Sequence, residues 1–577
     1  MGTAATTHAS AAQLRSSFGS QQLGLSIAAD AAPAEAADPE HGAVFTKRWV
    51  VELILDLAGY TADRPLGDLV AIEPACGEGA FLVPMVERLS DACRRDGRSL
   101  LDPLDAIRAY DLQTASVMAS RQAVVETLVG RDWPADQATD FADRVVQAGD
   151  FLLQDHVHGE ADFVLGNPPY VRLESVPNGR SEAYRRACET MSGRADIYVG
   201  FLEIGLKVLR PGGTLSFICA DRWMRNQYGR LLRQLVADHF SVEAAIEMHD
   251  VDAFEDEVSA YPSVITIRRR AQQPALVAET SAAFDARAAA GLAQWRLTAK
   301  AADELQGDAF RAAVLPGWFP GTSSWPTGSP VRLVALQELE DRLPALEDAA
   351  TGTRVGIGVA TGADRVFVTE DASAVEPDRL LPLAMAYDTL EGRLEWSGRY
   401  LVNPWRSDGG GLVDFDDFPE LRGYYEAHAD QLRARNVAKR RPRDWFRTID
   451  RVDPQLTGQD KLLFPDIKAA IHPVLDRGTS YPHHNLYFVV SRQWDLEVLG
   501  GLLLSRVAQM FIEAYAVRMR GGYLRFQAQY LRRIRVPQIA DVSDDVAEVL
   551  RDAFRRRDVA VATDIALGLY GLTELPD

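Results

Sequence analysis

Apolar positions in residues 41–270 alternate between two spacings. Short apolar runs such as "LVAIEP" and "ADFVLG" have the length of buried strands, whereas "GAFLVPMVERLSDACRR" and "DIYVGFLEIGLKVL" repeat apolar residues at helical spacing. Further strands are predicted in "IRAYD", "TLSFICA", "EAAIEMH" and "SVITIRR", and a further helix in "ASRQAVVETLV". This alternation predicts an α/β fold: a doubly wound, Rossmann-like and mostly parallel sheet with helices on both faces. Ligands of such sheets bind at the carboxyl ends of the strands.

The pattern changes on either side of this first domain, which we place at 41–275. Residues 1–40 are rich in Ala, Ser and Gly and lack a sustained period, which predicts a disordered tail. Residues 276–330 contain Ala and Pro without clear regularity, so we expect an irregular linker there. Residues 331–577 show short mixed elements and no repeats, which indicates a separate mixed α+β domain of similar size.

Charge is distributed unevenly along the 577 residues. The net charge of -20 by itself disfavours nucleic-acid binding, because phosphate contacts need Lys and Arg. Residues 431–451, however, hold eight Arg or Lys against two Asp, and residues 513–535 hold six Arg against one Glu. Both stretches interleave aromatic residues with Arg. A solvated helix face would explain one such stretch, but two in the same half of the chain favour a polyanionic partner.

Other compositional signals narrow the class of protein. No apolar run reaches the length of about 18–20 residues that spans a bilayer, and we find no signal peptide. The four cysteines are far apart, which argues against a disulfide framework and a cysteine-based zinc site. We therefore expect a cytoplasmic protein without membrane contact. We also expect no metal, because no metal-ligand cluster is recognisable in the sequence.

The segment "AIEPACGEGAFL" (71–82) ends a predicted strand and opens a helix through Gly77 and Gly79. Glycines at such a turn let a ligand approach the backbone closely. The segment is neither a G-x-G-x-x-G motif nor a P-loop, because no G-K-[ST] follows. A plain strand-to-helix connection remains the alternative for this turn alone.

Carboxylates follow the first three predicted strands. Glu73 precedes the glycine turn, Asp111 closes the second strand, and Asp150 follows the third beside Phe151. Together they suit a ribose, a cationic ammonium or sulfonium group, and an adenine ring. Each acid on its own could equally be a helix cap or turn residue.

The stretch "VLGNPPYVRL" places Asn167, Pro168, Pro169 and Tyr170 at the end of the next strand. Proline fixes φ and has no N–H, so this loop is stiff and its carbonyl groups can accept hydrogen bonds. The Asn167 side chain offers another acceptor, so two acceptors can hold both hydrogens of a planar amino group. Tyr170 offers a ring face to a nucleobase.

These segments in this order resemble the S-adenosylmethionine-dependent DNA adenine-N6 methyltransferases of the TaqI and Eco57I type, the gamma class. "HGAVFTKRWVVELIL" (41–55) resembles their N-terminal cofactor motif, "EPACGEGAFL" their glycine-rich motif, "GDFL" their adenine motif and "GNPPYV" their catalytic motif. The similarity is specific over residues 41–270. Residues 355–368 and 521–537 resemble the TaqI-like specificity domain more faintly.

The resemblance implies a site-specific enzyme that transfers a methyl group from S-adenosylmethionine to the N6 amine of adenine in duplex DNA, after flipping the base out. The adenine would stack on Tyr170 and on a second aromatic residue, for which we choose Phe254, with Tyr261 as the fallback. Asp196 either shapes the cofactor's adenine pocket or caps a helix. The implied catalytic residues are Asn167, Pro168, Pro169 and Tyr170, and the implied cofactor-binding residues are Thr46, Glu73, Ala75, Gly77, Asp111, Asp150, Phe151 and Asn167. The basic stretches supply the predicted DNA-binding residues Arg440, Arg441, Arg443, Arg525 and Arg532.

Other functions remain open at this point. The same motif occurs in methyltransferases that act on RNA adenine or protein glutamine, and cytosine N4 presents the same geometry as adenine N6. A fused restriction-modification enzyme would need a nuclease domain, and we recognise no nuclease signature. We therefore expect a separate cognate restriction endonuclease as partner. An inactive DNA-binding component of a defence system is the remaining alternative.

Overall fold

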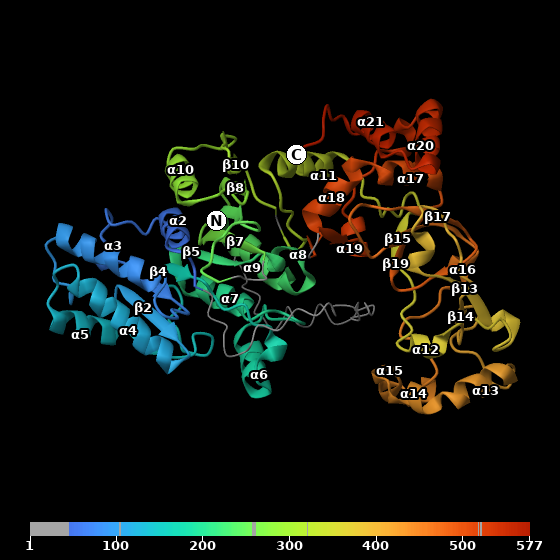
Figure 1. Ribbon diagram of the computed structural model, residues 1–577, viewed down its shortest axis with the longest axis horizontal. Helices are drawn as coiled ribbons and strands as arrows, with labels where there is room; N and C mark the ends of the chain where they lie inside the picture. The colour runs from blue at the N-terminus through green and yellow to red at the C-terminus, as the bar shows by residue number, and fades with distance from the viewer. Residues whose placement is uncertain are drawn as a thin grey trace, which may run out of the picture.

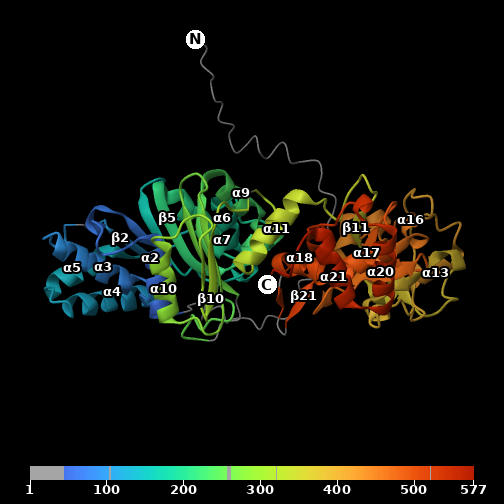
Figure 2. The same ribbon diagram turned by 90° about the horizontal axis from the view of Figure 1, so that it is seen from above.

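The computed structural model describes residues 45–102, 105–256, 261–319, 321–516, 518–519 and 522–576, so the predicted tail 1–40 lies outside the described residues. Two lobes lie side by side along the long axis of the molecule (Figures 1 and 2). The first lobe contains one large sheet, and the second contains three smaller ones. Helix α11 (Pro330–Arg342) lies between the lobes in both views.

The first lobe is built on a sheet with the strand order β3-β2-β1-β4-β5-β7-β6. The strands β1 to β5 are parallel where they pair, and β7 runs antiparallel to both of its neighbours. The order reverses at β1, with β2 on one side and β4 on the other, which creates a ligand crevice at their carboxyl ends. The strands are β1 (Ala71–Glu73), β2 (Ile107–Asp111), β3 (Val146–Ala148), β4 (Ala161–Gly166), β5 (Leu209–Ala220), β6 (Ser241–Glu247) and β7 (Pro262–Arg268).

Helices cover both faces of this sheet, as the sequence predicts. Successive residues of β4 point to opposite faces, so Phe163 and Leu165 join one apolar core while Val164 joins the other. One face is covered by α2 (Arg48–Ala58), α3 (Leu82–Arg95), α4 (Thr114–Val129), α5 (Ala135–Val145) and α10 (Ala286–Arg296). The other is covered by α6 (Asn178–Ala187), α7 (Tyr198–Val208), α8 (Arg222–Arg225) and α9 (Arg230–His239).

The stretch that we expected to be an irregular linker, 276–330, is largely regular. Strands β8 (Ala275–Thr280), β9 (Glu304–Gln306) and β10 (Phe310–Leu315), together with α10, extend the large sheet beyond β6 in the order β8-β10-β9. Strand β8 pairs parallel with β6, and β10 pairs antiparallel with β8. The short, Ala-rich strands lack a clear period of two, which explains why their pattern in the sequence is weak.

The second lobe is a mixed α+β unit. Its strands are β11 (Arg354–Ile357), β12 (Val368–Thr369), β13 (Leu380–Ala384), β14 (Tyr400–Val402), β15 (Asp460–Pro465), β16 (Ile467–Lys468), β17 (Val474–Arg477), β18 (Tyr481–Pro482), β19 (Leu486–Val490), β20 (Arg518–Met519) and β21 (Tyr523–Arg525). They form sheets ordered β11-β19-β15-β17, β12-β14-β13-β18 and β16-β21-β20. The helices are α12 (Asp364–Phe367), α13 (Pro419–Ala427), α14 (Ala429–Ala434), α15 (Asn436–Arg440), α16 (Pro454–Thr457), α17 (Leu496–Leu504), α18 (Arg506–Tyr515), α19 (Ala528–Leu531), α20 (Asp544–Arg556) and α21 (Val559–Tyr570).

The segment that leads into α11 joins the two lobes through backbone hydrogen bonds. The Trp325 N–H donates to the carbonyl of Met224 in the first lobe at 2.8 Å, and the Thr327 N–H donates to Ala514 in the second at 3.0 Å. The indole of Trp325 is fully buried and meets Trp223 at 5.2 Å between ring centroids. The lobes are therefore connected by packing and backbone contacts as well as by covalent continuity.

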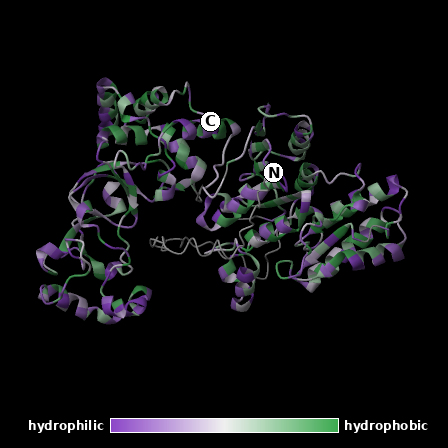
Figure 3. Cartoon of the chain, turned by 180° about the vertical axis from the view of Figure 1, so that it is seen from behind, coloured by the Kyte–Doolittle hydropathy of each residue, from purple (hydrophilic) through white to green (hydrophobic). Residues whose placement is uncertain are grey.

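Both lobes bury their apolar side chains between elements. In Figure 3 the outer helices carry hydrophilic and hydrophobic positions together, as amphipathic helices do. In the part of the chain that is described, no single helix is long and apolar enough to cross a membrane. The bent pair α17 and α18 meets that criterion only by length and composition.

Candidate active site

The glycine turn after β1 lies against the end of β2. Gly77 and Gly79 adopt φ values of +52° and +98°, a region that side chains disfavour. The Cys76 N–H donates to the carbonyl of Tyr110 at 2.8 Å, and the Gly77 N–H donates to Oδ2 of Asp111 at 3.0 Å. A Cβ placed on Gly77 would meet no atom within 4 Å. The turn therefore exposes backbone to open space next to the Asp111 carboxylate.

Glu73 ends β1 directly beneath this turn. Its side chain is 1% exposed, and its Oε2 has no hydrogen-bond partner among the described residues. Burial, together with the nearby negative charge of Asp111, raises the pKa of Glu73 well above its usual value. A buried carboxylate in this state is satisfied by a ligand that brings hydrogen-bond donors or positive charge. The predicted neighbour Ala75 is half-buried in the same turn.

Asp150 and Phe151 follow β3, as predicted, and both have protein partners. Asp150 accepts a hydrogen bond from the hydroxyl of Tyr184 on α6 at 2.8 Å and one from the Leu152 N–H at 3.2 Å. The Phe151 ring is 2% exposed and stacks on Phe201 with 5.7 Å between centroids. Contact of either residue with a cofactor stays a prediction.

The Asn-Pro-Pro-Tyr motif, here called the catalytic loop because the resemblance implies that role, lies beside the end of β1 because β4 pairs with β1. Gly166, the last residue of β4, has φ +157°, and a Cβ there would lie 3.5 Å from Pro74 and 3.8 Å from Glu73. The next residue is Asn167, whose Nδ2 donates to Oγ1 of Thr46 at 3.1 Å. Thr46 is buried. Pro168, which follows Asn167 in the loop, is also buried. Residues that are 121 positions apart in the sequence thus meet, as the motif order implied.

Aromatic rings surround the next position in the loop. The Tyr170 ring lies edge-on to Phe254, with 6.4 Å between centroids, and its hydroxyl donates to the carbonyl of Ile218 at 3.2 Å. Phe254 forms an isolated antiparallel bridge with Thr46. Tyr261, the fallback for the second stacking residue, packs instead on His249 at 5.0 Å. The structure therefore brings Phe254, and not Tyr261, into contact with the catalytic loop.

Asp196 lies in the same region but does not cap a helix through its side chain. Helix α7 begins at Tyr198, and no side-chain hydrogen bond caps it. Asp196 instead forms an isolated bridge with Arg172, next to the catalytic loop. Burial raises the pKa of its carboxyl, although the charges of Arg222 and Arg172 oppose the shift. The cap interpretation is therefore wrong, and the pocket interpretation stays a prediction.

The two basic stretches of the second lobe differ in their surroundings. Arg440, Arg441 and Arg443 are exposed, and within the described ranges none of the three forms an ion pair. Their guanidinium groups thus lie in solvent at the end of α15 and in the turn after it. They are available to phosphate groups.

Arg525 and Arg532, which we expected to bind DNA, have structural contacts instead. Arg525 is 12% exposed and pairs with Asp466. Arg532 pairs with Glu347 at 2.9 Å and donates to the carbonyl of Val355 at 2.7 Å. These carboxylates lie far away in the sequence, so they offset the local excess of Arg only in the folded lobe. Contact of either residue with DNA stays a prediction, and we leave both out of the DNA-binding surface proposed below.

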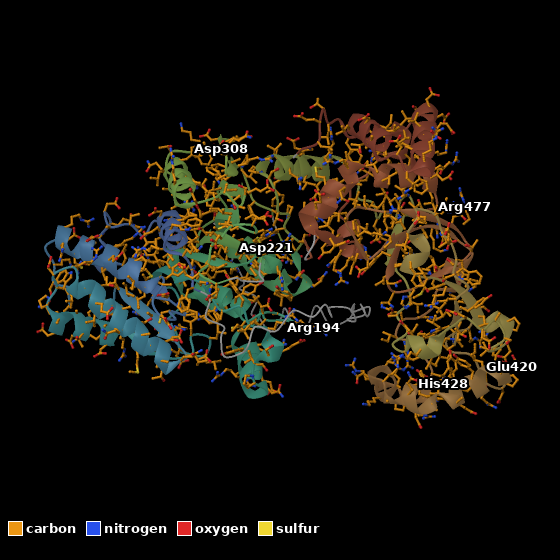
Figure 4. The ribbon with its side chains drawn as sticks, viewed as in Figure 1. Arg194, Asp221, Asp308, Glu420, His428 and Arg477 are labelled. Atoms are coloured by element: carbon orange, nitrogen blue, oxygen red, sulfur yellow. The ribbon has the colours of Figure 1, made fainter. Side chains whose placement is uncertain are left out.

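A buried charged cluster beside the lobe boundary has no counterpart in the sequence-based expectations. It contains Asp221, Arg225, Glu247 and His249, and Asp221 is labelled in Figure 4. The His249 ring lies 2.8 Å from Oδ2 of Asp221 and 2.7 Å from Oε1 of Glu247. Arg225 pairs with Asp221 and also donates to Thr327 at 3.2 Å and to the Ala516 carbonyl at 3.4 Å. The cluster thus connects the ends of two strands of the first lobe to the second lobe.

Comparison with known proteins decides the family. The type II methyltransferase M.PaeR7I of Pseudomonas aeruginosa is 43% identical over 543 residues, with 92% of both chains covered. This chain belongs to the type II DNA methyltransferase family. M.XhoI of Xanthomonas vasicola, another type II methyltransferase, is 41% identical and covers 93% of this chain and 98% of its own.

The family models and the solved structure that match this type II DNA methyltransferase agree with its division into two lobes. Residues 115–254 match the Eco57I restriction-modification methylases, and residues 422–536 match the TaqI-like C-terminal specificity domain. Among solved structures, the type IIL restriction-modification enzyme MmeI in complex with DNA has a TM-score of 0.54 at 12% identity. It matches over 92% of this chain and 74% of its own, which supports the fold.

The cofactor of the family, S-adenosylmethionine, suits the residues present. Oε2 of the buried Glu73 carboxylate has no hydrogen-bond partner among the described residues, and Asp111 and the open face of the glycine turn lie beside it. A ligand with a cationic amino-acid part and ribose hydroxyls would satisfy both acids. The type II DNA methyltransferase identity and this crevice thus lead to the same cofactor.

Proposed function

We propose that this DNA methyltransferase modifies the N6 amine of adenine in duplex DNA at a specific sequence. The observation that carries the proposal is the position of Asn167. It lies next to the Glu73 crevice and donates a hydrogen bond to Thr46. Three residues further on, the ring of Tyr170 lies against Phe254. A polar loop that ends in an aromatic pair suits a planar base with an exocyclic amine. Cytosine shares that amine, so the choice of adenine rests also on the resemblance of the motif.

In the reaction, the protein positions the amine and localises the lone pair on its nitrogen. The lone pair of the adenine amine is delocalised into the ring, which makes it a poor nucleophile. We infer that the Asn167 side-chain oxygen and the Pro168 carbonyl accept its two N–H groups and localise the lone pair on nitrogen. S-adenosylmethionine, when bound, supplies an electrophilic methyl group. The new N–C bond forms as the S–C bond breaks, and one amine proton leaves to solvent.

The base must leave the duplex before it reaches Asn167. Unstacking and unpairing cost a few kcal/mol, and stacking on an aromatic ring recovers about 1–3 kcal/mol. Tyr170 is held for this task, because its hydroxyl is bonded to Ile218 and its edge contacts Tyr198 at 6.4 Å. Phe254 lies edge-on to the Tyr170 ring. We propose that both rings contact the flipped adenine.

Sequence recognition belongs to the second lobe in this proposal. Arg440, Arg441 and Arg443 contact phosphate groups and hold the lobe on the duplex, while other side chains read base edges. We further propose a separate restriction endonuclease that recognises the same sequence. A lysate of the source organism should then cut an unmodified plasmid and leave uncut a plasmid that this enzyme has methylated. Equal cutting of both plasmids would contradict the partnership.

The direct test is methylation of mixed-sequence duplex DNA with labelled S-adenosylmethionine, followed by nucleoside analysis. The wild type is compared with Asn167→Ala and with Asn178→Ala, an exposed asparagine on α6 that serves as the matched control. We expect label in N6-methyladenine for the wild type and the control, and none for Asn167→Ala. Label in RNA or in glutamine side chains, and none in DNA, would overturn the proposal.

A further inference from the structure

A polar cluster in the second lobe has the composition of a metal site. Asp364, His483 and His484 place one carboxylate oxygen and two imidazole nitrogens within 4.8 Å of one another. His483 is buried, His484 is half-buried and Asp364 is exposed. Because Asp364 precedes the two histidines by about 120 positions, no spacing pattern reveals the cluster in the sequence.

The distances match those of a single coordinated ion. Nε2 of His483 lies 3.2 Å from Oδ2 of Asp364 and 3.0 Å from Nδ1 of His484. A tetrahedral zinc ion with ligand atoms about 2.1 Å away holds neighbouring ligand atoms about 3.4 Å apart. These two separations need to grow by only a few tenths of an ångström to surround an ion, and the third pair of ligand atoms lies within 4.8 Å.

Hydrogen bonds hold all three candidate ligands in place. The His483 N–H donates to Ala384 at 2.9 Å and the His484 N–H to Val359 at 3.1 Å, so both lie fixed between β18 and β19. Gly358 permits the approach of β11, because a Cβ there would lie 2.2 Å from the His483 carbonyl. The other oxygen of Asp364 accepts a hydrogen bond from Thr361, which orients the carboxylate. Hydrogen bonds of the Thr361–Asp364 kind orient ligating carboxylates, whereas Nδ1 of His483 has no hydrogen-bond partner among the described residues.

We propose that Asp364, His483 and His484 bind a divalent transition-metal ion of the zinc type, with a fourth position open to solvent. Two imidazoles and a carboxylate suit Zn²⁺, and sites with three protein ligands keep a water in the remaining position. The exposed side of Asp364, whose side chain is 49% accessible, provides that opening. This proposal departs from the expectation that the protein has no metal, which stays a prediction.

The ion would fasten α12 to the β18–β19 connection of the specificity lobe. The carbonyl of Thr361, three residues before Asp364, also accepts from Arg435 at 2.9 Å, directly before α15. Figure 1 shows α12 close to α14 and α15. The site therefore supports the segment that carries the exposed arginines. This role rests on the lobe itself and does not depend on which base the enzyme methylates.

The test is metal binding by the full-length protein after dialysis against a chelator. Titration calorimetry with Zn²⁺, and visible spectroscopy with Co²⁺ as a probe of coordination, are run on the wild type, Asp364→Asn and His484→Ala. His428→Ala is the matched control, because His428 lies elsewhere in the same lobe (Figure 4). Asp364 is exposed, so its variant keeps the fold even if His484→Ala does not, and thermal unfolding checks both.

The expected result is one Zn²⁺ per chain for the wild type and the control, with a tetrahedral Co²⁺ spectrum. Loss of a residue that only hydrogen-bonds to a ligand weakens metal binding about 10–100-fold, so loss of a ligand should weaken it at least about 100-fold. An absence of stoichiometric binding would overturn the site. So would an affinity that both ligand variants retain unchanged while they remain folded.

Discussion

The two lobes hold their functional groups in different ways. In the first lobe, the polar groups lie at the ends of adjacent strands of one sheet, and a hydrogen bond of 3.1 Å joins Asn167 to Thr46. In the second lobe, three small sheets and many short helices spread charged residues over the surface, and Arg440, Arg441 and Arg443 have no ion-pair partner among the described residues.

This difference matches the division between chemistry and recognition that we propose. A reaction centre needs a few groups at fixed positions, and a continuous sheet supplies them because its strand ends meet at one edge. Phosphate contacts along a duplex add up from many sites of modest individual strength. A single substitution at the reaction centre of the first lobe should therefore abolish methylation. A single substitution on the second lobe should weaken DNA binding only in part.

The largest expected effect is that of Asn167→Ala on turnover. Removal of one positioning hydrogen bond at a reacting group costs on the order of 10³-fold in rate. DNA binding and the melting temperature should change little, because Asn167 is only half-buried. Single-turnover rates and gel-shift affinities measured together would check this. A parallel loss of DNA affinity would mean that the first lobe also carries the binding energy.

Arg225→Met should strongly lower the free energy of unfolding. It should not change the methyl-transfer step specifically. Arg225 is 2% exposed and pairs with Asp221, so its truncation leaves a buried carboxylate without its strongest partner. Breaking such a pair costs about 3–5 kcal/mol in the free energy of unfolding. Denaturant unfolding would measure the loss, with Arg186→Met on the exposed surface of α6 as the control. Unchanged stability would show that the cluster contributes nothing at the lobe boundary.

The triple variant Arg440→Ala, Arg441→Ala, Arg443→Ala should weaken DNA binding in a salt-dependent way. Three lost phosphate contacts reduce the slope of log affinity against log salt by about 3. Arg525→Ala should instead lower stability and leave that slope unchanged, because its guanidinium is occupied by Asp466. Binding isotherms at several salt concentrations separate the two outcomes. The reverse result would restore the residues of 521–537 to the DNA surface.

The smallest expected effect is a change of stability at alkaline pH. Burial disfavours the charged imidazole of His249, but hydrogen bonds to Asp221 and Glu247 outweigh burial and raise its pKa to about 9. A raised pKa in the folded state stabilises the protein fully below the unfolded value of about 6.5, and this contribution is lost as pH rises through about 9. Melting temperatures between pH 6 and 10 should fall for the wild type and vary less for His249→Gln. Identical pH profiles for both proteins would contradict this assignment.

Sequence patterns predicted the first lobe well because its site is carried by short local segments. The turn at Gly77, the acids at Glu73 and Asp111, and the loop at Asn167 each follow a predicted strand, and the strand order brings them together. The sequence already favoured Phe254 over Tyr261 in the same segment, and the structure shows that Phe254 contacts Tyr170 while Tyr261 packs on His249. The strands β8 and β10 were missed because their Ala-rich sequences lack a clear alternation.

Long-range partners could not be predicted from the sequence. Arg525 resembles Arg440 in its sequence context, yet Asp466 neutralises only Arg525, across 59 positions. His249 and Arg225 each find Asp221 only after β5 and β6 enter the same sheet. The same holds for Asp364 and His483, which form a cluster only in the folded lobe.

The most direct test of the central claim is to map modified bases in the DNA of cells that express this enzyme. We expect N6-methyladenine at one recurring sequence, present with the wild type and absent with Asn167→Ala. N4-methylcytosine in place of N6-methyladenine, or DNA that remains unmodified while the wild-type protein is folded and binds S-adenosylmethionine, would contradict it.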